Sequence, residues 1–327
     1  MSSWREFGTR STHLPREPLD EGTRVAGDLP RTLRPVAGDD VRQRALFDPS
    51  LRHNFRAYRA GDPVFDDPDR TVAWVAARRA AMDAVLLSIS ESPWVDSLVL
   101  RGSVLPADRF GEAAREPGDL DFVVVPHTWP MESARTGRML EGIAAAADGR
   151  AGIRAPGAVC EDIWTYDRVP GRRMVLPWSV PGLPAGQVQL DFVFNERLAR
   201  PPEPVELACG ALVLAATPAL SLAWKVLWLI SDRHPQGKDL YDAVLLAEHH
   251  RLPNSLLQEV FREAGEWPHP NAEVGPEHIE FLVPNGYVGA EWEHFEAEYP
   301  HLAGPGEEAF VARLAAALRP TFSGEAP

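Results

Sequence analysis

The chain lacks the features that mark several common classes of protein. Its 327 residues contain two cysteines, Cys160 and Cys209, which excludes a disulfide framework and a zinc site built on cysteine pairs. No apolar run reaches the roughly 18 residues of a membrane-spanning helix, and the first residues lack the apolar stretch of a signal peptide. We therefore expect a soluble, cytoplasmic protein with no membrane partner.

Basic residues are also scarce relative to acidic ones. The chain has 33 Lys and Arg against 47 Asp and Glu, which gives a net charge of −14. This excess argues against a protein coated in basic surface for unselective nucleic-acid binding. A local basic patch stays open, because Arg168, Arg172, Arg173, Arg197 and Arg200 flank one β-rich stretch.

Four common catalytic signatures are missing as well. The sequence contains no GxSxG, HExxH, GxxxxGK[ST] or GxGxxG motif, so the usual serine-hydrolase, zinc-protease, P-loop and dinucleotide-binding signatures are excluded. Hydrophobic residues nevertheless make up 45% of the chain, which is enough for a substantial buried core.

The apolar pattern divides the chain into three parts. Residues 1–67 show no clear periodicity and predict an extended or partly disordered arm. Residues 68–216 mix helical and strand-like stretches, and residues 217–327 are helical in pattern. The expected fold class is α/β (α+β), with a mixed-sheet domain followed by a helical domain.

Individual elements follow from the same pattern. Asp67-Pro68 is typical of a helix start and predicts a helix that ends near Ser92. Short apolar runs predict buried strands at 97–100 and 120–125, and a β-meander from about 158 to 194 whose last strand covers 188–194. Further helices are predicted over 131–148, 220–230, 240–250, 254–263 and 307–318.

Two aspartates one residue apart open the predicted strand at 120–125. Residues i and i+2 of a strand point to the same side, so Asp119 and Asp121 would face one point. Two carboxylates held together repel each other unless a cation compensates, and Mg²⁺ prefers carboxylate oxygens. The pair therefore suggests a metal site, although Gly118-Asp119 is equally typical of a turn.

A third carboxylate, Asp191, lies within the strand predicted over 188–194. An unpaired carboxylate in a central strand is costly, so Asp191 needs a partner. If the two strands are neighbours, Asp191 joins Asp119 and Asp121 in a cluster that suits a two-metal phosphoryl-transfer site. The alternatives are a strand end that faces solvent and an ion pair with an arginine such as Arg197.

Two further motifs are candidates for binding an anion. Arg101-Gly102-Ser103 follows a strand and precedes a short helical stretch, where backbone amides favour phosphate. Lys225 lies in the apolar run 220–230, so its ammonium needs an anionic partner. That partner is either a structural one, Asp239 or Asp242, or the triphosphate of a nucleotide.

Together these motifs resemble the AbiEii/AbiGii toxin family of nucleotidyltransferases, within the polymerase β-like superfamily. The resemblance covers roughly residues 95–250 and rests on the RGS motif, on Arg115-x-x-x-Asp119-Leu120-Asp121, on the later strand with Asp191, and on Lys225 followed by Lys238-Asp239-Leu240-Tyr241-Asp242. The chain departs from the family at Pro117, where a threonine or serine is common, and at Lys238, where an arginine is common.

The resemblance implies an enzyme that moves a nucleoside monophosphate from an NTP to a hydroxyl group. It implies two Mg²⁺ ions held by Asp119, Asp121 and Asp191, and a nucleotide bound by Arg101, Gly102, Ser103, Lys225, Lys238, Asp239 and Asp242. The three metal ligands and Lys225 are the residues it marks as catalytic.

The family precedent further implies an RNA end such as tRNA, or a protein hydroxyl, as acceptor, and a cognate antitoxin as partner. Two alternatives are a transferase for small, antibiotic-type molecules and a nucleotidyltransferase fold that binds nucleotide without turnover. For any active version we expect the Asp119/Asp121 strand to lie beside the Asp191 strand, with their carboxylates within about 8 Å, since two metals about 3.5–4 Å apart must be shared. We expect the helical half to bring Lys225 across the nucleotide cleft.

Overall fold

The computed structural model describes residues 4, 7, 13–165, 169–265, 273–280 and 289–323. Contacts within the chain divide it into two compact units. The first comprises Met1–Leu100, Gly118–Glu196 and Pro204–Leu214, and the second comprises Arg101–Pro117, Arg197–Glu203 and Ala215–Pro327. The last stretch of the second unit begins close to the boundary expected at residue 216.

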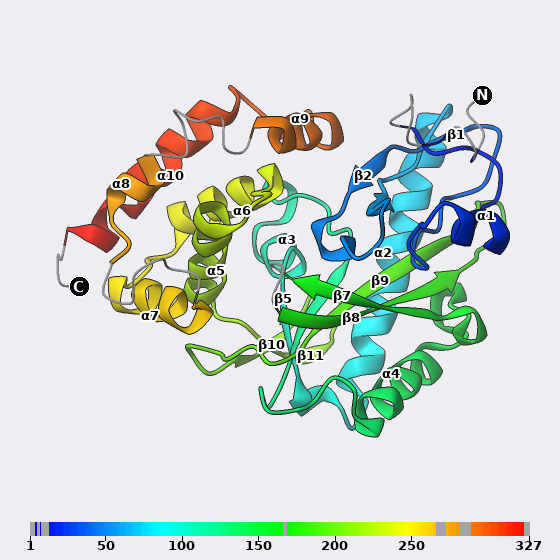
Figure 1. The fold of residues 1–327 in the computed structure, drawn as a ribbon, viewed down its shortest axis with the longest axis horizontal. Helices are drawn as coiled ribbons and strands as arrows, with labels where there is room; N and C mark the ends of the chain where they lie inside the picture. The colour runs from blue at the N-terminus through cyan, green and yellow to red at the C-terminus, as the bar shows by residue number, and fades with distance from the viewer. Residues whose placement is uncertain are drawn as a thin grey trace. The chain divides into compact units, whose positions relative to one another are not determined.

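A seven-stranded mixed sheet is the centre of the first unit (Figure 1). Its order is β10-β11-β5-β6-β9-β8-β7, in which β6 pairs with β9 in parallel and β9, β8 and β7 form an antiparallel meander. The strands are β5 (Leu98–Arg101), β6 (Leu120–Val124), β7 (Val159–Thr165), β8 (Val169–Trp178), β9 (Gly186–Val193), β10 (Glu203–Glu206) and β11 (Leu212–Ala215). The predicted meander is confirmed, whereas β10 and β11 were not predicted.

Helix α2 (Pro68–Ser90) packs against β9 and against α4 (Ala134–Ala147). It begins where the sequence predicts, because the Asp67 side chain accepts a hydrogen bond from the backbone N–H of Asp69 and Pro68 occupies the first turn. The indole of Trp74 lies 5.3 Å from that of Trp178 on β8, measured between ring centroids. This contact anchors α2 to the sheet.

The two faces of the sheet carry different chemistry. In the parallel register of β6 and β9, Asp121 lies beside Asp191 and Phe122 beside Phe192. Since successive strand residues point to opposite faces, the two aspartates share one face and the two phenylalanines the other. The phenylalanine rings stack with centroids 5.6 Å apart and are fully buried.

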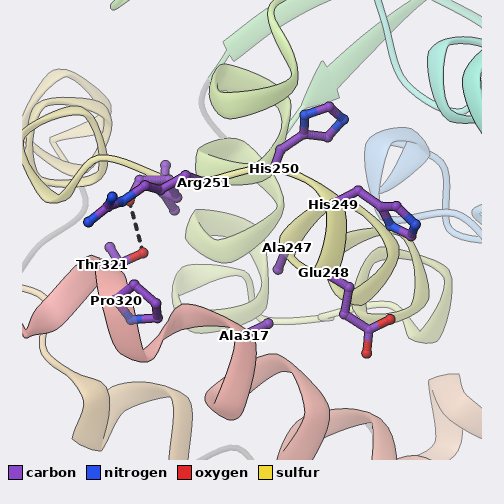
Figure 2. Close-up of a pocket in the computed structure, with 9 residues that line it drawn as sticks. Ala247, Glu248, His249, His250, Arg251, Ala317, Pro320 and Thr321 are labelled. Carbon is purple, nitrogen blue, oxygen red and sulfur yellow. Dashed lines mark hydrogen bonds between the residues drawn. The ribbon is translucent and has the colours of Figure 1, made fainter. Parts of the chain in front are cut away.

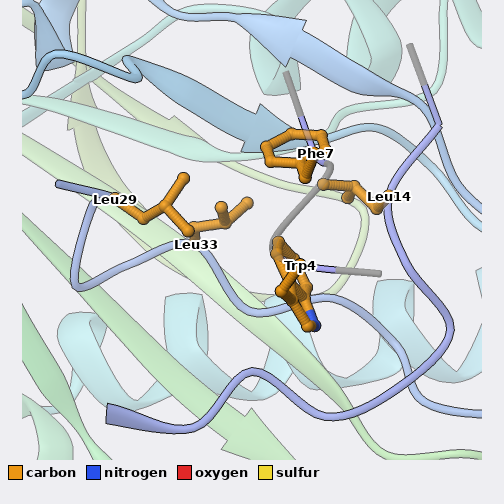
Figure 3. Packing of buried hydrophobic residues seen from close by; sticks show 5 residues of the cluster. All are labelled: Trp4, Phe7, Leu14, Leu29 and Leu33. Carbon is orange, nitrogen blue, oxygen red and sulfur yellow. The ribbon is translucent and has the colours of Figure 1, made fainter. Parts of the chain in front are cut away.

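Residues 13–67, for which the sequence predicts an extended arm, form short elements within the first unit. These are α1 (Glu21–Ala26), the strand pair β1 (Val41–Arg42) and β4 (Val64–Phe65), the pair β2 (Ala45–Phe47) and β3 (Tyr58–Ala60), and the 3-10 turn η1 (Pro49–Leu51). A separate apolar cluster packs against β2 and β3 through Ala45, Tyr58 and Ala60, and it consists of Trp4, Phe7, Leu14, Leu29 and Leu33 (Figure 3). Elements of two to six residues are too short to create a periodic pattern.

The second unit is helical. The predicted helices are confirmed as α5 (Pro218–Ser231), α6 (Gly237–His249), α7 (Asn254–Ala264) and α10 (Glu307–Phe322), and the short helical stretch expected after Ser103 is α3 (Val104–Phe110). The structure adds α8 (Pro276–Glu280) and α9 (Gly289–Glu298). Aromatic rings join α6, α9 and α10, where Tyr241 stacks on Phe295 and Trp292 lies beside Phe310.

The predicted mixed α/β fold class is therefore confirmed. Within the described part of the chain, no helix is both long and apolar enough to cross a membrane.

We expect Phe192→Ala to lower the free energy of unfolding by about 3–5 kcal/mol, because it removes a fully buried ring and leaves a cavity beside Phe122. Urea unfolding followed by circular dichroism measures the loss. The matched control is Phe55→Ala, whose ring is 86% exposed and whose removal should cost about 0.5 kcal/mol or less. Equal losses in the two variants would contradict the packing described above.

Candidate metal centre

Three carboxylates meet on one face of the sheet. Asp119 directly precedes β6, Asp121 lies within β6, and Asp191 lies beside Asp121 on β9. One oxygen from each of the three side chains lies within 4.8 Å of the other two. The two strands are neighbours, as expected. The separation of the three carboxylates is below the upper limit of about 8 Å that is set by two shared metals.

The local sequence explains this arrangement. Leu120 and Phe122 are fully buried on the side of the strand away from the aspartates, whereas Asp119 and Asp121 are only half-buried. The apolar residues thus fix the register of β6, and the register fixes the direction of both carboxylates.

Asp191 is paired with Arg173 rather than with Arg197, the arginine suggested by the sequence. Arg173 lies opposite Asp191 on β8, and its Nε and Nη2 donate to the two carboxylate oxygens at 2.8 and 2.7 Å. Both side chains are buried, with 3% and 7% of the respective residue exposed. A carboxylate offers about four lone-pair sites, so this pair leaves acceptor capacity at Asp191.

Arg173 also binds a second carboxylate. Its Nη1 donates to Oδ2 of Asp48 at 2.7 Å, and its Nη2 lies 3.2 Å from Oγ of Ser50. Burial opposes ionisation of Asp48, but the attraction of Arg173 and Arg59 outweighs it and holds the pKa of that carboxyl well below its usual range. Burial raises the pKa of Asp191 and outweighs the attraction of Arg173, whose guanidinium is shared with Asp48. The anions of Asp119 and Asp48 raise this pKa further.

The donor set fits a hard divalent cation. Three carboxylates whose oxygens lie within 4.8 Å supply the ligand type that Mg²⁺ selects, and two positive charges would relieve the repulsion among them. Asp119, Asp121 and Asp191 are the residues that would hold the metal.

Arg101, Gly102 and Ser103 belong to the second unit and link β5 to α3. Gly102 has φ of 79°, a conformation that favours glycine. Ser103 is 1% exposed, and its hydroxyl makes no hydrogen bond to a described group. The Arg101 guanidinium lies over the rings of Trp224 and Trp228, 5.2 and 5.5 Å from their centroids.

Lys225 is paired within the second unit. Its Nζ lies 2.7 Å from Oδ1 of Asp239 and 3.1 Å from Oδ2 of Asp242. Arg115 approaches Asp242 from another side, and its Nη2 donates to Oδ2 at 3.0 Å. The structural partner considered from the sequence is thus present, and only 5% of Lys225 is exposed.

Lys238, at the start of α6, differs from Lys225. It is half-buried, and in the described ranges no carboxylate lies within ion-pair distance of it. Lys225 and Lys238 lie in the second unit and the three aspartates in the first, so their meeting at one nucleotide stays a prediction.

The basic patch considered from the sequence is largely neutralised. Arg172 pairs with Asp162, Arg197 with Glu263 and Arg200 with Glu259, while Arg173 is buried between its two aspartates. Arg168 lies outside the described residues.

A pocket of about 440 Å³ lies between the end of α6 and α10 (Figure 2). Glu248 at its edge is paired with Arg313 at 2.8 Å, and Thr321 donates to the backbone oxygen of Leu252 at 2.9 Å. These polar groups serve the helix packing, so we assign no ligand to the pocket.

The sequence interpretation missed Asp48 and, although it named Arg173 and Arg115, it missed the partners of both in these networks. Arg173 had a usable signal, since it stands directly before the apolar run Met174–Leu176 in a predicted meander. Its partner depends on strand register, which the sequence leaves undefined. Asp48 precedes Pro49 and caps η1, but nothing in a segment without periodicity connects it to residue 173.

Three clustered carboxylates on neighbouring parallel strands suit a metal-dependent phosphoryl-transfer site. The family model described as "Nucleotidyl transferase AbiEii toxin, Type IV TA system" matches residues 84–317. The match spans well over half of the chain, which therefore belongs to this family, as the resemblance indicated. No curated protein matches the chain.

We expect Asp242→Asn to lower the free energy of unfolding by about 3–5 kcal/mol at pH 7, because it leaves the buried cations of Arg115 and Lys225 undercompensated. Burial opposes ionisation of Asp242, but these two cations outweigh it and hold its pKa below the ordinary 3.8. The ionised carboxylate therefore stabilises the fold fully above the unfolded-state pKa, and this contribution is lost as the pH falls through the folded-state pKa.

Urea unfolding of the wild type and of Asp242→Asn is measured between pH 7 and 3. The difference between their free energies of unfolding should narrow below about pH 4. Glu248→Gln is the control, since its pair with Arg313 is partly exposed and should contribute about 0–1 kcal/mol. A difference that stays constant down to pH 3 would exclude the assigned role of the Asp242 charge.

Proposed function

We propose that this protein is a Mg²⁺-dependent nucleotidyltransferase that moves a nucleoside monophosphate from an NTP to a hydroxyl acceptor. The observation that carries the proposal is the set of three carboxylates, contributed by two adjacent parallel strands, whose oxygens lie within 4.8 Å of one another. Membership of the AbiEii family supports the same reaction class.

In this reaction the acceptor oxygen bonds to the α-phosphorus, the bond from that phosphorus to the β-phosphate oxygen breaks, and pyrophosphate leaves. Bound Mg²⁺ supplies positive charge at the transferring phosphoryl group and lowers the pKa of the acceptor hydroxyl. Asp119, directly before β6, and Asp121, within β6, would hold the metal. Asp191 would complete the ligand set from β9 and receive the hydroxyl proton.

The nucleotide phosphates require cations and hydrogen-bond donors. We assign Gly102 and Ser103 to the phosphates, because the buried Ser103 hydroxyl has no hydrogen-bond partner among the described residues. Lys238 would contribute a positive charge to the phosphates. An ion-pair and cation–π network around Trp228 would contribute to nucleotide binding. It contains Lys225, Arg101, Asp239 and Asp242.

For the acceptor we propose an RNA end such as that of tRNA, or a protein hydroxyl, with the protein acting as the toxin of a type IV system and paired with a cognate antitoxin. The family description supports the toxin role. The paired state of Arg172, Arg197 and Arg200 argues for selective contacts rather than a broad basic surface.

We expect Asp119→Ala and Asp121→Ala each to reduce transfer of label from α-³²P-NTP by about 100-fold or more, because each removes charge stabilisation at the reacting phosphate. The thermal midpoint should stay unchanged or rise, since one of three mutually repelling carboxylates is removed. Asp162→Ala is the control, because Asp162 lies on β7 outside the cluster and should keep full transfer. Transfer that survives both cluster substitutions would end the proposal.

Incubation with each labelled NTP and, separately, total tRNA, cell lysate or aminoglycosides identifies the acceptor. We expect label on tRNA or on a protein band, and strongest on tRNA at low salt, where electrostatic binding is greatest. Label on aminoglycosides alone would establish a small-molecule transferase, and an unlabelled tRNA sample at low salt would exclude the RNA acceptor.

One observation favours a second candidate, a fold that binds nucleotide without turnover: both oxygens of Asp191 already accept hydrogen bonds from Arg173. Calorimetry with each NTP and Mg²⁺, combined with a pyrophosphate-release assay, separates the two. Tight binding without pyrophosphate release would establish the binding module.

A further inference from the structure

A row of charged side chains crosses the sheet and ends at the metal cluster. In the strand registers Glu161 of β7 lies beside Arg173 of β8, Arg173 beside Asp191 of β9, and Asp191 beside Asp121 of β6. Directly paired residues point to the same face of a sheet, so the row is continuous. The cluster is thus one end of a longer polar arrangement.

The N-terminal segment, residues 28–60, contacts two members of this row, Glu161 and Arg173. Glu161 accepts hydrogen bonds from the backbone N–H groups of Arg31 and Thr32 at 3.0 and 3.1 Å, and from Oγ1 of Thr32 at 2.6 Å. Asp48 accepts one from Nη1 of Arg173 at 2.7 Å. These segment residues precede residue 84, where the match to the family begins.

The Asp48 carboxylate is itself held in place. Its Oδ1 accepts from the backbone N–H and the hydroxyl of Ser50 at 3.1 and 2.7 Å, and its backbone N–H donates to the Ala57 oxygen at 2.8 Å. Asp48 is 8% exposed and Arg173 is 3% exposed. The guanidinium therefore has a fixed anchor on the side away from Asp191.

We propose that Asp48 is a positioning residue of the metal centre and acts through Arg173 to hold Asp191 in the orientation that binds the metal. This inference rests on the proposed metal-dependent function and adds that a segment outside the family match completes the site. Asp48 contributes in two ways. It fixes the guanidinium, and its negative charge offsets the positive charge that Arg173 places beside the ligands.

Asp48→Asn keeps the shape of the side chain and removes its charge. Arg173 then keeps its positive charge next to Asp191 without an anionic anchor, which weakens the attraction for a cation and loosens the ligand. We expect the dissociation constant for Mn²⁺, measured by calorimetry on the full chain, to rise about 10- to 100-fold, the range typical of residues that orient metal ligands. In the transfer assay, saturating Mg²⁺ should restore most of the rate.

Asp62→Asn is the matched control. Asp62 belongs to the same part of the chain and pairs with another buried arginine, Arg78 of α2, through Nη2 and Oδ2 at 3.0 Å. It lies outside the row and the cluster. We expect it to lower the thermal midpoint as Asp48→Asn does, while its Mn²⁺ affinity equals that of the wild type.

Ser50→Ala keeps the charge of Asp48 and provides a milder test should Asp48→Asn fail to fold. It removes the hydroxyl hydrogen bond to Oδ1 of Asp48 and the contact of Nη2 of Arg173 with Oγ, keeps the backbone hydrogen bond, and should weaken Mn²⁺ binding in the same direction by a smaller factor. Wild-type affinity in a folded Asp48→Asn, or in Ser50→Ala if that is the variant that folds, overturns the inference and leaves the proposed function intact. A wild-type chain that neither binds Mn²⁺ nor transfers label overturns the proposed function itself.

Discussion

The parallel pairing of β6 with β9 is the constraint on which the candidate site depends. It sets Asp121 beside Asp191 and Phe122 beside Phe192, so one register buries an aromatic stack and assembles an anionic cluster on the opposite face. A slip by one residue would turn Phe192 toward the carboxylates and Asp191 into the apolar core. The burial of the two rings therefore stabilises the geometry of the site as well as the fold.

Each unit contains one network of buried ions among its described residues. Arg173 lies between Asp191 and Asp48, and Asp242 lies between Arg115 and Lys225. In each case one central charge meets two of opposite sign, which makes removal of a single partner costly and fixes side-chain orientation. A site that must place ligands accurately benefits from such shared anchoring.

The sequence predicts those parts of the molecule that depend on local pattern. The start of α2 at Asp67-Pro68, the strands that carry Asp121 and Asp191, and the helices α5, α6, α7 and α10 follow from periodicity and capping residues. The link from Asp48 to Arg173 does not, because it joins residues 125 positions apart through a register that only the folded sheet defines. The pairing of Lys225 was one of two alternatives, and choosing between them required the burial and distances of its neighbours.

The family match begins at residue 84, inside α2, which runs from Pro68 to Ser90. The first turns of that helix hold its cap at Asp67 and the Trp74 ring that lies against Trp178 of β8. The family match therefore begins inside an element of the first unit and not at its start. A fragment cut at residue 84 would keep every aspartate of the cluster, yet it would uncover Glu161 and Arg173 and would leave only residues 84–90 of the 23-residue helix α2.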